Sequence, residues 1–306
     1  MILPTPIDKL KVKLNSNNFF VKRDDLLPFS FGGNKARKAV YFFDEIEKRN
    51  NDVVVTYGSS SSNHCRVVAN MAKSRGLDCY IITPQEGHKE TNNSKMVALL
   101  GAKIIKTPLE NVANTIEQVM EHLKKDHNPY FIQGGGHGNI GTQAYVDAYK
   151  EIKDYEKEKR IKFDYIFLAS GTGTTQAGLV AGKIKHKDDD KKIIGVSIAR
   201  ANPRGESVVI QSVKDYFMDG KDYVEEINFI DKYICGGYGK SNTEITKVIK
   251  EVLSYEGMSL NLTYTGKAFW GMKCYIEENN IMNKNILFIN TGGTPLFFDD
   301  LEEMQT

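Results

Sequence analysis

The stretch Y-I-F-L-A-S-G-T-G-T-T-Q-A-G-L-V, residues 165–180, contains a predicted strand, a loop and the start of a helix in direct succession. Its apolar run at 165–169 predicts a buried strand, and residues 176–180 predict a helix that follows the loop. The loop at 170–175 offers backbone amides, three threonine hydroxyls and the positive end of a helix dipole. Such a loop suits a phosphate group. No Gly-Lys-Ser/Thr follows at the spacing of a nucleoside-triphosphate loop, so we do not expect nucleotide hydrolysis.

The same succession of strand and helix recurs along the chain. Other apolar runs that predict strands lie at 52–57, 79–83, 103–106, 130–133, 193–197 and 286–289. Segments with helical periodicity lie at 62–75, 93–100, 112–125 and 141–160. Alternating strands and helices predict an α/β fold with open parallel sheets, in which ligands bind at the carboxyl ends of the strands.

Length and charge predict a globular protein with a small-molecule partner. With 306 residues, of which 41% are hydrophobic, the chain can bury a sizeable core, and its length suggests about two domains. The 41 basic and 39 acidic residues nearly cancel, so we expect no nucleic-acid partner. No apolar stretch is long enough for a signal sequence or a bilayer span. We therefore expect a cytoplasmic protein with no membrane partner.

The charged runs and the cysteines predict no site of their own. Residues 151–162 and 183–192 are dense in charges of both signs, a pattern typical of a solvated face. Four widely spaced cysteines, with no C-x-x-C pair, are Cys65, Cys79, Cys235 and Cys274. This spacing predicts free, buried thiols and neither a disulfide framework nor a metal site.

A second loop, F-G-G-N-K-A-R-K at 31–38, places two lysines one helical turn apart. The adjacent glycines Gly32 and Gly33 would let the backbone approach a ligand closely, and Lys35 and Lys38 would share one helix face. One amine could bind a ligand covalently while the other meets a phosphate, because burial and neighbouring cations make a lysine nucleophilic enough for a Schiff base. The same letters also fit a helix N-terminus with solvated lysines.

Two further loops offer alternatives. The loop S-S-S-S-N-H at 59–64 places hydroxyls and free N–H groups at a helix start, where Ser62 would hold a carboxylate or would simply cap the helix. Residues 136–141 read G-H-G-N-I-G and match the letters of a dinucleotide fingerprint. That fingerprint needs a ribose-binding acid about twenty residues later, and here the position falls inside a charged helix. The match is therefore a weak signal for nicotinamide binding.

Between residues 4 and 297 the chain carries, in unbroken order, K-R-D-D, G-G-N-K-A-R-K, S-S-N-H-C-R, S-G-T-G-T-T-Q-A-G, G-G-Y-G, Y-T-G-K-A and N-T-G-G-T-P. Together these motifs resemble the D-cysteine desulfhydrase and 1-aminocyclopropane-1-carboxylate deaminase family. Its members are pyridoxal-phosphate enzymes of fold type II, the tryptophan-synthase-β-like type. The resemblance implies two open parallel-sheet domains with pyridoxal 5′-phosphate in the cleft between them. It also implies a large domain at 1–40 and 149–306, a smaller inserted domain at 41–148, and a homodimer.

The resemblance also assigns cofactor-binding residues. Lys35 matches the Schiff-base lysine, Lys38 matches the lysine at the phosphate, and Asn63 matches the amide at the ring hydroxyl. The remaining cofactor contacts that we expect are Thr172, Gly173, Thr174 and Thr175 in the phosphate loop, with Thr265 and Thr291.

The predicted catalytic and substrate-binding residues follow in the same way. The substrate carboxylate is expected at Ser62, Asn63 and His64. Two active-site tyrosines match Tyr238 and Tyr264. The catalytic residues implied by the resemblance are Lys35, Ser62, Tyr238 and Tyr264, and no metal is expected.

Two positions favour the desulfhydrase side of the family. The deaminases resembled here carry glutamate where this chain has Thr265, and glutamine where it has His64. A carboxylate at the ring nitrogen would make the cofactor a deep electron sink, whereas a hydroxyl favours passing electrons to a leaving group, as in β-elimination. Against this, T-Q-A-G at 175–178 resembles the deaminase loop, and L-N-L-T at 260–263 departs from the usual L-D-P-x.

We therefore expect a pyridoxal-phosphate-dependent lyase or deaminase that acts on a small amino acid. The first candidate is a D-cysteine desulfhydrase, which yields pyruvate, sulfide and ammonia. The alternatives are a 1-aminocyclopropane-1-carboxylate deaminase, which yields 2-oxobutyrate and ammonia, and a racemase or a non-catalytic pyridoxal-phosphate carrier on the same scaffold.

Overall fold

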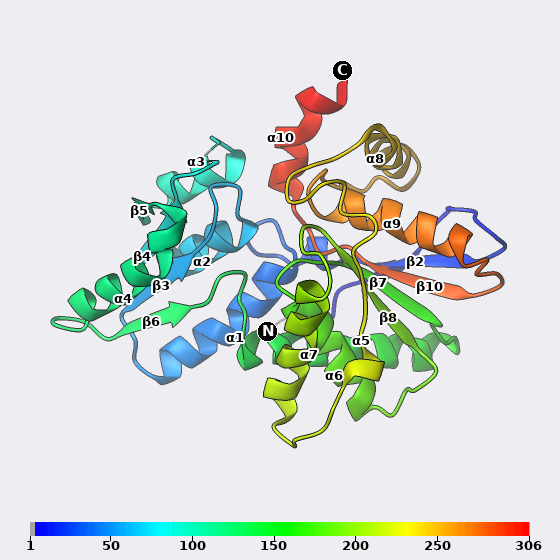
Figure 1. Ribbon diagram of the computed structural model, residues 1–306, viewed down its shortest axis with the longest axis horizontal. Coiled ribbons are helices and arrows are strands. Elements are labelled where there is room, and N and C mark those ends of the chain that lie inside the picture. The colour runs from blue at the N-terminus through cyan, green and yellow to red at the C-terminus, as the bar shows by residue number, and fades with distance from the viewer. Residues whose placement is uncertain (1–3, 88, 306) are drawn as a thin grey trace.

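Two sheets form the framework of the computed structural model, which describes residues 4–87 and 89–305 (Figure 1). The larger sheet has six strands in the order β1-β2-β10-β7-β8-β9, and the smaller has four in the order β5-β4-β3-β6. Neighbouring strands in these sheets run parallel, apart from the antiparallel pair β1 and β2. The predicted α/β class with open parallel sheets is confirmed. Among the described residues, no helix combines the length and hydropathy needed to cross a membrane.

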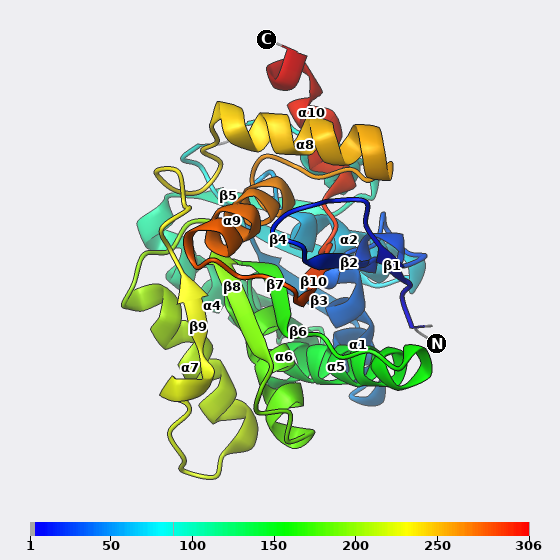
Figure 2. The same ribbon diagram turned by 90° about the vertical axis from the view of Figure 1, so that its right-hand side faces the viewer.

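The larger sheet is covered by helices on both faces (Figure 2). Its strands are β1 (Ile7–Lys9), β2 (Asn18–Lys22), β7 (Tyr165–Ser170), β8 (Lys192–Ser197), β9 (Asn228–Ile230) and β10 (Asn285–Ile289). Its helices are α5 (Asn139–Lys159), α6 (Thr174–Lys185), α7 (Arg204–Phe217), α8 (Thr243–Glu256) and α9 (Thr265–Glu278). Side chains alternate along each strand, so Phe19 and Val21 pack in the core beneath α8 and α9, whereas Phe20 packs with α5, α6 and α7.

The smaller sheet is covered in the same manner. Its strands are β3 (Val53–Tyr57), β4 (Asp78–Pro84), β5 (Lys103–Thr107) and β6 (Pro129–Ile132). Helices α1 (Asn34–Lys48) and α2 (Asn63–Ser74) share a core with Val54, whereas α4 (Val112–Leu123) shares a core with Val53 and Val55. Helix α3 (Asn92–Leu99) lies beside α2 and against α10 (Thr294–Gln305), which ends the described chain.

The positions of the strands support the proposed division into two domains. All strands of the smaller sheet fall between residues 41 and 148, and those of the larger sheet fall outside this range. The proposed boundaries lie inside α1 and α5, two helices that pack against each other. The division would therefore pass through shared helices and not through a flexible linker. The boundaries themselves remain a proposal.

The expectation of a solvated face at 151–162 and 183–192 was partly wrong. Glu156, Asp188 and Lys191 are buried. Lys191 Nζ lies 2.7 Å from a Glu156 oxygen and 2.8 Å from an Asp188 oxygen, and Lys153 Nζ lies 2.9 Å from Asp188. Opposite charges compensate one another, which makes their burial tolerable. The cluster ties α5 to the turn between α6 and β8.

The cysteines are free, as predicted, but only two of them are fully buried. Cys65 and Cys79 lie in the core of the smaller sheet, whereas Cys235 and Cys274 are partly exposed. Burial raises the pKa of Cys65 to about 11 and that of Cys79 to about 12, so both thiols stay protonated near neutral pH.

Candidate active site

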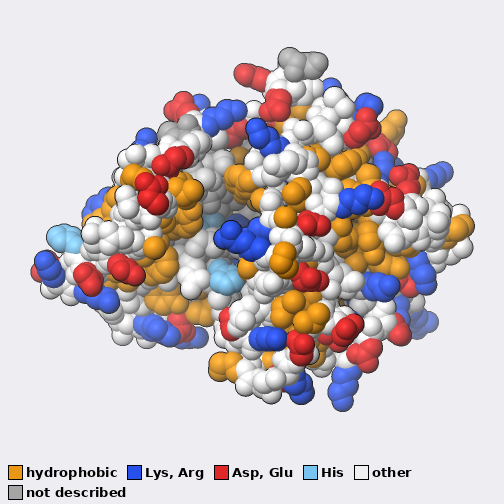
Figure 3. Space-filling view, in the orientation of Figure 1, with side chains coloured by type: hydrophobic (Ala, Val, Ile, Leu, Met, Phe, Trp, Pro, Cys, Tyr) orange, Lys and Arg blue, Asp and Glu red, His pale blue; other side chains and the backbone are white. Residues whose placement is uncertain are grey.

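A cavity of about 690 Å³ lies where loops at the carboxyl ends of both sheets meet. Figure 3 shows the molecule hollowed between the two halves, with histidine and basic side chains at the hollow. The lining includes residues from the predicted loops at 31–38, 59–64, 136–141 and 170–175, together with Thr291 and Gly292 of the N-T-G-G-T-P motif. A second hollow of about 920 Å³ shares Gln133 and His137 with it but lacks Lys35 and the threonine loop. The smaller cavity is therefore the candidate active site.

Most of the predicted site residues meet in this cavity. Those that line it are Lys35, Ser62, Asn63, His64, Thr172, Gly173, Thr175, Tyr238, Tyr264 and Thr291. Lys38, Thr174 and Thr265 are fully buried and do not form part of the wall.

Lys35 stands near the start of α1, where the backbone is shaped by glycine. Gly33 has a φ of 93°, and a Cβ atom there would lie 2.6 Å from the carbonyl oxygen of Thr291. The Lys35 amine donates to the carbonyl oxygen of Gly135 over 2.9 Å. Burial lowers the pKa of Lys35 to about 8, so a sizeable fraction of the amine is unprotonated near neutral pH. That fraction can act as a nucleophile.

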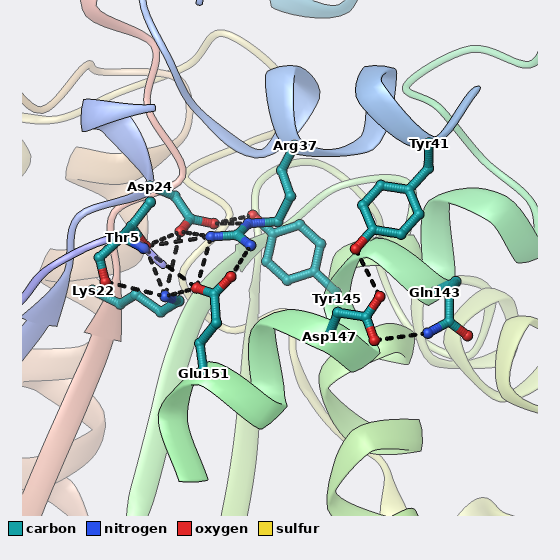
Figure 4. A network of polar contacts seen from close by, with 9 residues as sticks. All are labelled: Thr5, Lys22, Asp24, Arg37, Tyr41, Gln143, Tyr145, Asp147 and Glu151. Carbon is teal, nitrogen blue, oxygen red and sulfur yellow. Dashed lines mark hydrogen bonds and ion pairs between the residues drawn. The ribbon is translucent and has the colours of Figure 1, made fainter. Parts of the chain in front are cut away.

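A buried ion network anchors the helix that carries this lysine (Figure 4). Arg37 of α1 pairs with Asp24 over 2.8 Å and with Glu151 of α5 over 2.6 Å. Lys22 of β2 also pairs with Glu151, and Tyr145 donates to Asp24 over 2.5 Å. The two cations and two carboxylates compensate one another, so the network holds α1, α5 and β2 in a fixed arrangement.

Lys38 is a buried amine that lacks an acceptor. Its side chain is 1% exposed, and its Nζ atom has no hydrogen-bond partner within the described chain. Burial and the nearby Lys35 amine lower the pKa of Lys38 well below its usual range. A bound anion would satisfy this amine and restore its charge.

The threonine loop leaves the N-terminus of α6 open. Gly173, the residue before the helix, has a φ of 84°, and no side chain caps the helix start. Thr174 Oγ1 instead lies 2.8 Å from His137 Nδ1, and Thr175 Oγ1 accepts a hydrogen bond from Asn34 over 3.1 Å. The hydroxyls of Thr174 and Thr175 therefore hold the loop in place, and the free N–H groups remain available to an anion.

Ser62 has the capping role considered for it and also reaches the cavity. It caps α2 by accepting the Cys65 N–H over 3.2 Å, and it also lines the cavity. The carboxylate site expected there would thus combine the Ser62 hydroxyl with the N–H groups of the first helical turn.

His64 is neutral, and its tautomer follows from its partner. Thr56 donates its single hydroxyl proton to the carbonyl oxygen of Ile132 over 2.7 Å. The Thr56 oxygen, 2.8 Å from His64 Nε2, must therefore accept from that nitrogen. Burial, with Lys35 and Lys38 nearby, lowers the pKa of His64 well below its usual range. Its Nδ1 carries no proton, so a carboxylate would meet the backbone N–H of His64 and not its ring.

The amide of Asn63 is oriented by residues that sequence reasoning missed. Its Oδ1 atom accepts from Asn93 over 3.0 Å and from Arg66 over 3.3 Å. Buried Arg66 also donates to Asn93 Oδ1 over 2.8 Å and to Ser30 Oγ over 2.8 Å. Burial lowers the pKa of Arg66 to about 10. Because both donors fix the oxygen, the NH₂ group of Asn63 is left to donate within the cavity.

Tyr238 and Tyr264 form a hydrogen-bonded pair in the cavity wall. Their hydroxyl oxygens are 2.6 Å apart, and the Ser61 hydroxyl lies 3.4 Å from that of Tyr238. Burial and the neighbouring Tyr238 raise the pKa of Tyr264 well above its usual range, so this hydroxyl stays protonated. A protonated hydroxyl that is hydrogen-bonded to a second one can deliver a proton and be resupplied.

Thr291 reaches the cavity, whereas Thr265 does not. Thr265 Oγ1 accepts hydrogen bonds from the backbone and side-chain nitrogens of Asn261 over 3.1 Å and 3.0 Å, behind the wall. Thr265 therefore does not line the cavity, and its predicted contact with the cofactor stays a prediction. Within the described chain, no acidic side chain lines the cavity.

The chain is similar in sequence to known proteins. Residues 1–292 match the family model described as pyridoxal-phosphate dependent enzyme. The chain is a member of this family. A protein from Thermotoga maritima with the provisional name 1-aminocyclopropane-1-carboxylate deaminase is 34% identical over 302 residues, which is 95% of this chain and 94% of the relative. D-cysteine desulfhydrase from Yersinia pestis is 30% identical over 310 residues, 96% of this chain and 92% of the relative.

A solved structure agrees with this assignment. The crystal structure described as that of an ACC deaminase homologue covers 99% of this chain and 93% of its own, with a TM-score of 0.87 and 29% identity. The pyridoxal-phosphate enzyme described here thus has the tryptophan-synthase-β-like fold of the deaminase and desulfhydrase family, as the resemblance implied. The weak nicotinamide signal at 136–141 was misleading, because the chain belongs to the pyridoxal-phosphate family, and His137 of this loop contacts Thr174 at the start of α6.

The residues present fit pyridoxal phosphate. The orphaned Lys38 amine and the open α6 N-terminus would hold its phosphate, and Asn63 would donate to its ring hydroxyl. Lys35 would hold it covalently, and Thr291, which lines the same cavity, remains a predicted cofactor contact. Gly135 must lack a side chain here, because a Cβ atom would lie 2.8 Å from Thr172 and 3.3 Å from the Lys35 amine.

Proposed function

We propose that this pyridoxal-phosphate enzyme catalyses β-elimination from a small amino acid, with D-cysteine as the first candidate substrate. One observation carries the proposal: the described cavity wall offers the Thr291 hydroxyl but no carboxylate that would keep the ring nitrogen protonated. Without that carboxylate the cofactor is a shallower electron sink, which favours passing electrons to a leaving group at the β carbon.

Each residue of the site then has a separate role in the proposed reaction. Pyridoxal phosphate supplies the conjugated ring that accepts charge from the α carbon of the substrate. The N-terminus of α2, with Ser62, would hold the substrate carboxylate and fix which bond faces the ring. The Lys35 amine, whose pKa burial lowers to about 8, would take the α proton.

The tyrosine pair would assist the leaving group. The sulfur must carry a proton to leave as hydrosulfide, and the hydroxyl of Tyr264 can supply one because burial and Tyr238 raise its pKa and keep it protonated. Tyr238, 2.6 Å away and partly exposed to solvent, can resupply that proton. The overall products from D-cysteine would be sulfide, pyruvate and ammonia.

Ring opening of 1-aminocyclopropane-1-carboxylate to 2-oxobutyrate and ammonia is the second candidate. It is supported by the T-Q-A-G sequence at 175–178 and by the provisional name of the Thermotoga maritima relative. A racemase would use the same cofactor residues, and a non-catalytic carrier would keep Lys35 but would not need the tyrosine pair.

The two candidates are separated by one comparison of rates. Purified, cofactor-loaded enzyme should show a higher kcat/KM for D-cysteine, measured as sulfide and pyruvate, than for the cyclopropane substrate, measured as 2-oxobutyrate. Both enantiomers of cysteine and serine should be assayed beside them, with Lys35→Ala as the inactive control. Turnover of the cyclopropane substrate alone would reject the first candidate, and interconversion of enantiomers without elimination would indicate a racemase.

A further inference from the structure

Arg200 is a charged residue of the cavity wall to which the proposed reaction gives no role. It follows strand β8 and enters the cavity beside Ile198 and Ala199, from the side of the larger sheet. Its backbone is held firmly, because Ser197 Oγ donates to the Arg200 carbonyl oxygen over 2.6 Å and accepts from the Ala199 N–H over 3.3 Å. The base of the side chain therefore has a defined position at the cavity.

The guanidinium group of Arg200 is partly exposed and makes no hydrogen bond or ion pair with another described residue. Its Nη1 atom is shielded from solvent and makes no hydrogen bond within the described chain. The charged neighbour that acts on it is another cation, Arg204 at the start of α7, and burial together with Arg204 lowers the pKa of Arg200. A cation with no counter-ion beside a second positive charge favours a bound anion, which the accessible nitrogens of the guanidinium group could reach from the cavity.

The other anions expected in the complex already have binding groups. The phosphate of the cofactor has the Lys38 amine and the open N-terminus of α6. The α-carboxylate of the substrate has Ser62 and the N-terminus of α2, on the smaller sheet. Arg200 lies on the larger sheet, and no acidic side chain in the described cavity wall compensates it. Basic side chains at the edge of the hollow are visible in Figure 3.

We propose that Arg200 binds a second anionic group of the substrate, carried by the amino-acid side chain. A guanidinium donates two parallel hydrogen bonds to a carboxylate, a geometry that a neutral amide cannot match. This inference rests on one part of the proposed function, namely that the cavity binds an amino acid. It narrows the substrate class to amino acids with a negatively charged side chain. Cysteine belongs to this class as its thiolate, whose sulfur must take a proton from Tyr264 before it leaves as hydrosulfide.

Aspartate and asparagine test this directly, because they have nearly the same shape and differ in charge. Each enantiomer should be titrated into cofactor-loaded protein, and its Kd read from the change in cofactor absorbance, which requires no turnover. Aspartate should bind about ten- to a hundredfold more tightly than asparagine in the parent protein, as expected for charge-assisted hydrogen bonds. Arg200→Met should abolish this preference, and Arg200→Lys should keep part of it.

Arg204→Met is the matched control, because Arg204 is an exposed neighbour outside the cavity wall. It should change the preference by less than about threefold, since exposed charges are screened. The Kd for pyridoxal phosphate should be the same in Arg200→Met and in the parent.

Two outcomes would overturn the proposal. The first is an absence of preference for aspartate in the parent, which decides the matter even if Arg200→Met fails to fold. The second is an unchanged preference in Arg200→Met with weaker cofactor binding, which would assign Arg200 to the phosphate. Failure of D-cysteine turnover would affect the proposed function alone, because the binding ratios are measured without reaction.

Discussion

Burial sets the chemistry of individual side chains in this site. It lowers the pKa of Lys35 to about 8 and places the pKa of Lys38 well below its usual range, with Lys35 nearby adding to the second effect. The same factor, together with Tyr238, raises the pKa of Tyr264. The site thus contains an amine that can lose its proton and a hydroxyl that keeps it, which is the combination that α-proton removal and leaving-group protonation require.

Tyr264→Phe should lose most of its kcat while it retains the cofactor. Removing one hydroxyl leaves the packing of the ring nearly intact, whereas loss of a positioned proton-transfer group costs about a hundredfold to ten-thousandfold in rate. Tm, cofactor absorbance and kcat of the purified variant check this. Tyr255→Phe, the same change at an exposed tyrosine, is the control. Near-normal turnover of Tyr264→Phe would give the proton-transfer role to Lys35 or Tyr238.

Asn93→Leu should change the spectrum of the bound cofactor, and it should also lower the stability of the fold, because it removes the acceptor of the buried Arg66 Nε atom. Without Asn93, the amide oxygen of Asn63 keeps only the longer contact with Arg66, so the amide can rotate. The ring hydroxyl then loses an oriented donor, and we expect its ionised form to become less populated, with absorbance moving to shorter wavelength. Asn92→Leu, which leaves these contacts intact, is the control. An unchanged spectrum would remove Asn93 from the positioning of Asn63.

Sequence reasoning found the site residues that lie in recognisable loops and missed those defined by distant contacts. Lys35, Ser62 and Thr172 stand in glycine- or serine-rich loops after strands, a local signal. Arg66 ends the S-S-N-H-C-R motif but was given no role, and Arg200 has no local signal, because their importance depends on Ser30, Asn93 and the cavity wall. Thr265 was assigned by position in a motif, and only the contact with Asn261 shows where its hydroxyl points.

At the scale of elements, the cofactor lysine depends on how α1 is held. The network in Figure 4 joins α1 to β2 and α5 through Asp24, Arg37 and Glu151. Burial raises the pKa of Asp24, but the Arg37 and Lys22 cations outweigh that effect and lower it from 3.8 to about 2. The ionised carboxylate therefore stabilises the folded state above its usual pKa, and this contribution is lost as the pH falls toward about 2.

Asp24→Asn should destabilise the protein strongly at neutral pH. Removing one charge leaves Arg37 and Lys22 buried with a single carboxylate between them, which costs about 3–5 kcal/mol of unfolding free energy. The difference from the parent should shrink as the pH falls from 3.8 toward about 2, because the parent loses its own Asp24 charge in that window. Urea unfolding at several pH values measures this.

The exposed pair of Lys150 and Asp154 provides the control for the ion network. Asp154→Asn removes a solvent-exposed partner on α5 and should cost less than about 1 kcal/mol. If Asp24→Asn is no more costly than this control, the network does not anchor α1.

The strands that were not predicted have physical reasons for being missed. Strands β1 and β9 are three residues long, too short for a periodic pattern. Strand β2 ends in Lys22, which is 0% exposed, and its sequence runs into the charged K-R-D-D motif. A buried lysine in a strand is tolerated because Asp24 and Glu151, the latter far along the chain, compensate its charge. The longer apolar runs were predicted as strands because each is bounded by loop residues and followed by a helix.

At the scale of the whole molecule, function depends on two sheets that share one cavity. The larger sheet contributes the threonine loop, Arg200 and Thr291, and the smaller contributes the N-terminus of α2. Substrate and cofactor would therefore contact both halves.

We also propose a homodimer, as the family resemblance implies, which sedimentation of the loaded enzyme would test. The amino-acid composition predicts neither the oligomeric state nor the substrate. The near-neutral net charge favours a small-molecule partner but does not say which one.

The central claim is that Lys35 carries the cofactor while Lys38 meets its phosphate. Reducing the loaded protein with borohydride and mapping its peptides tests this claim most directly. The phosphopyridoxyl group should appear on Lys35, and Lys38→Ala should keep this attachment while binding pyridoxal phosphate more weakly. Lys35→Ala should yield no labelled peptide. A phosphopyridoxyl group on Lys38, or on no lysine of the parent protein, would contradict the account.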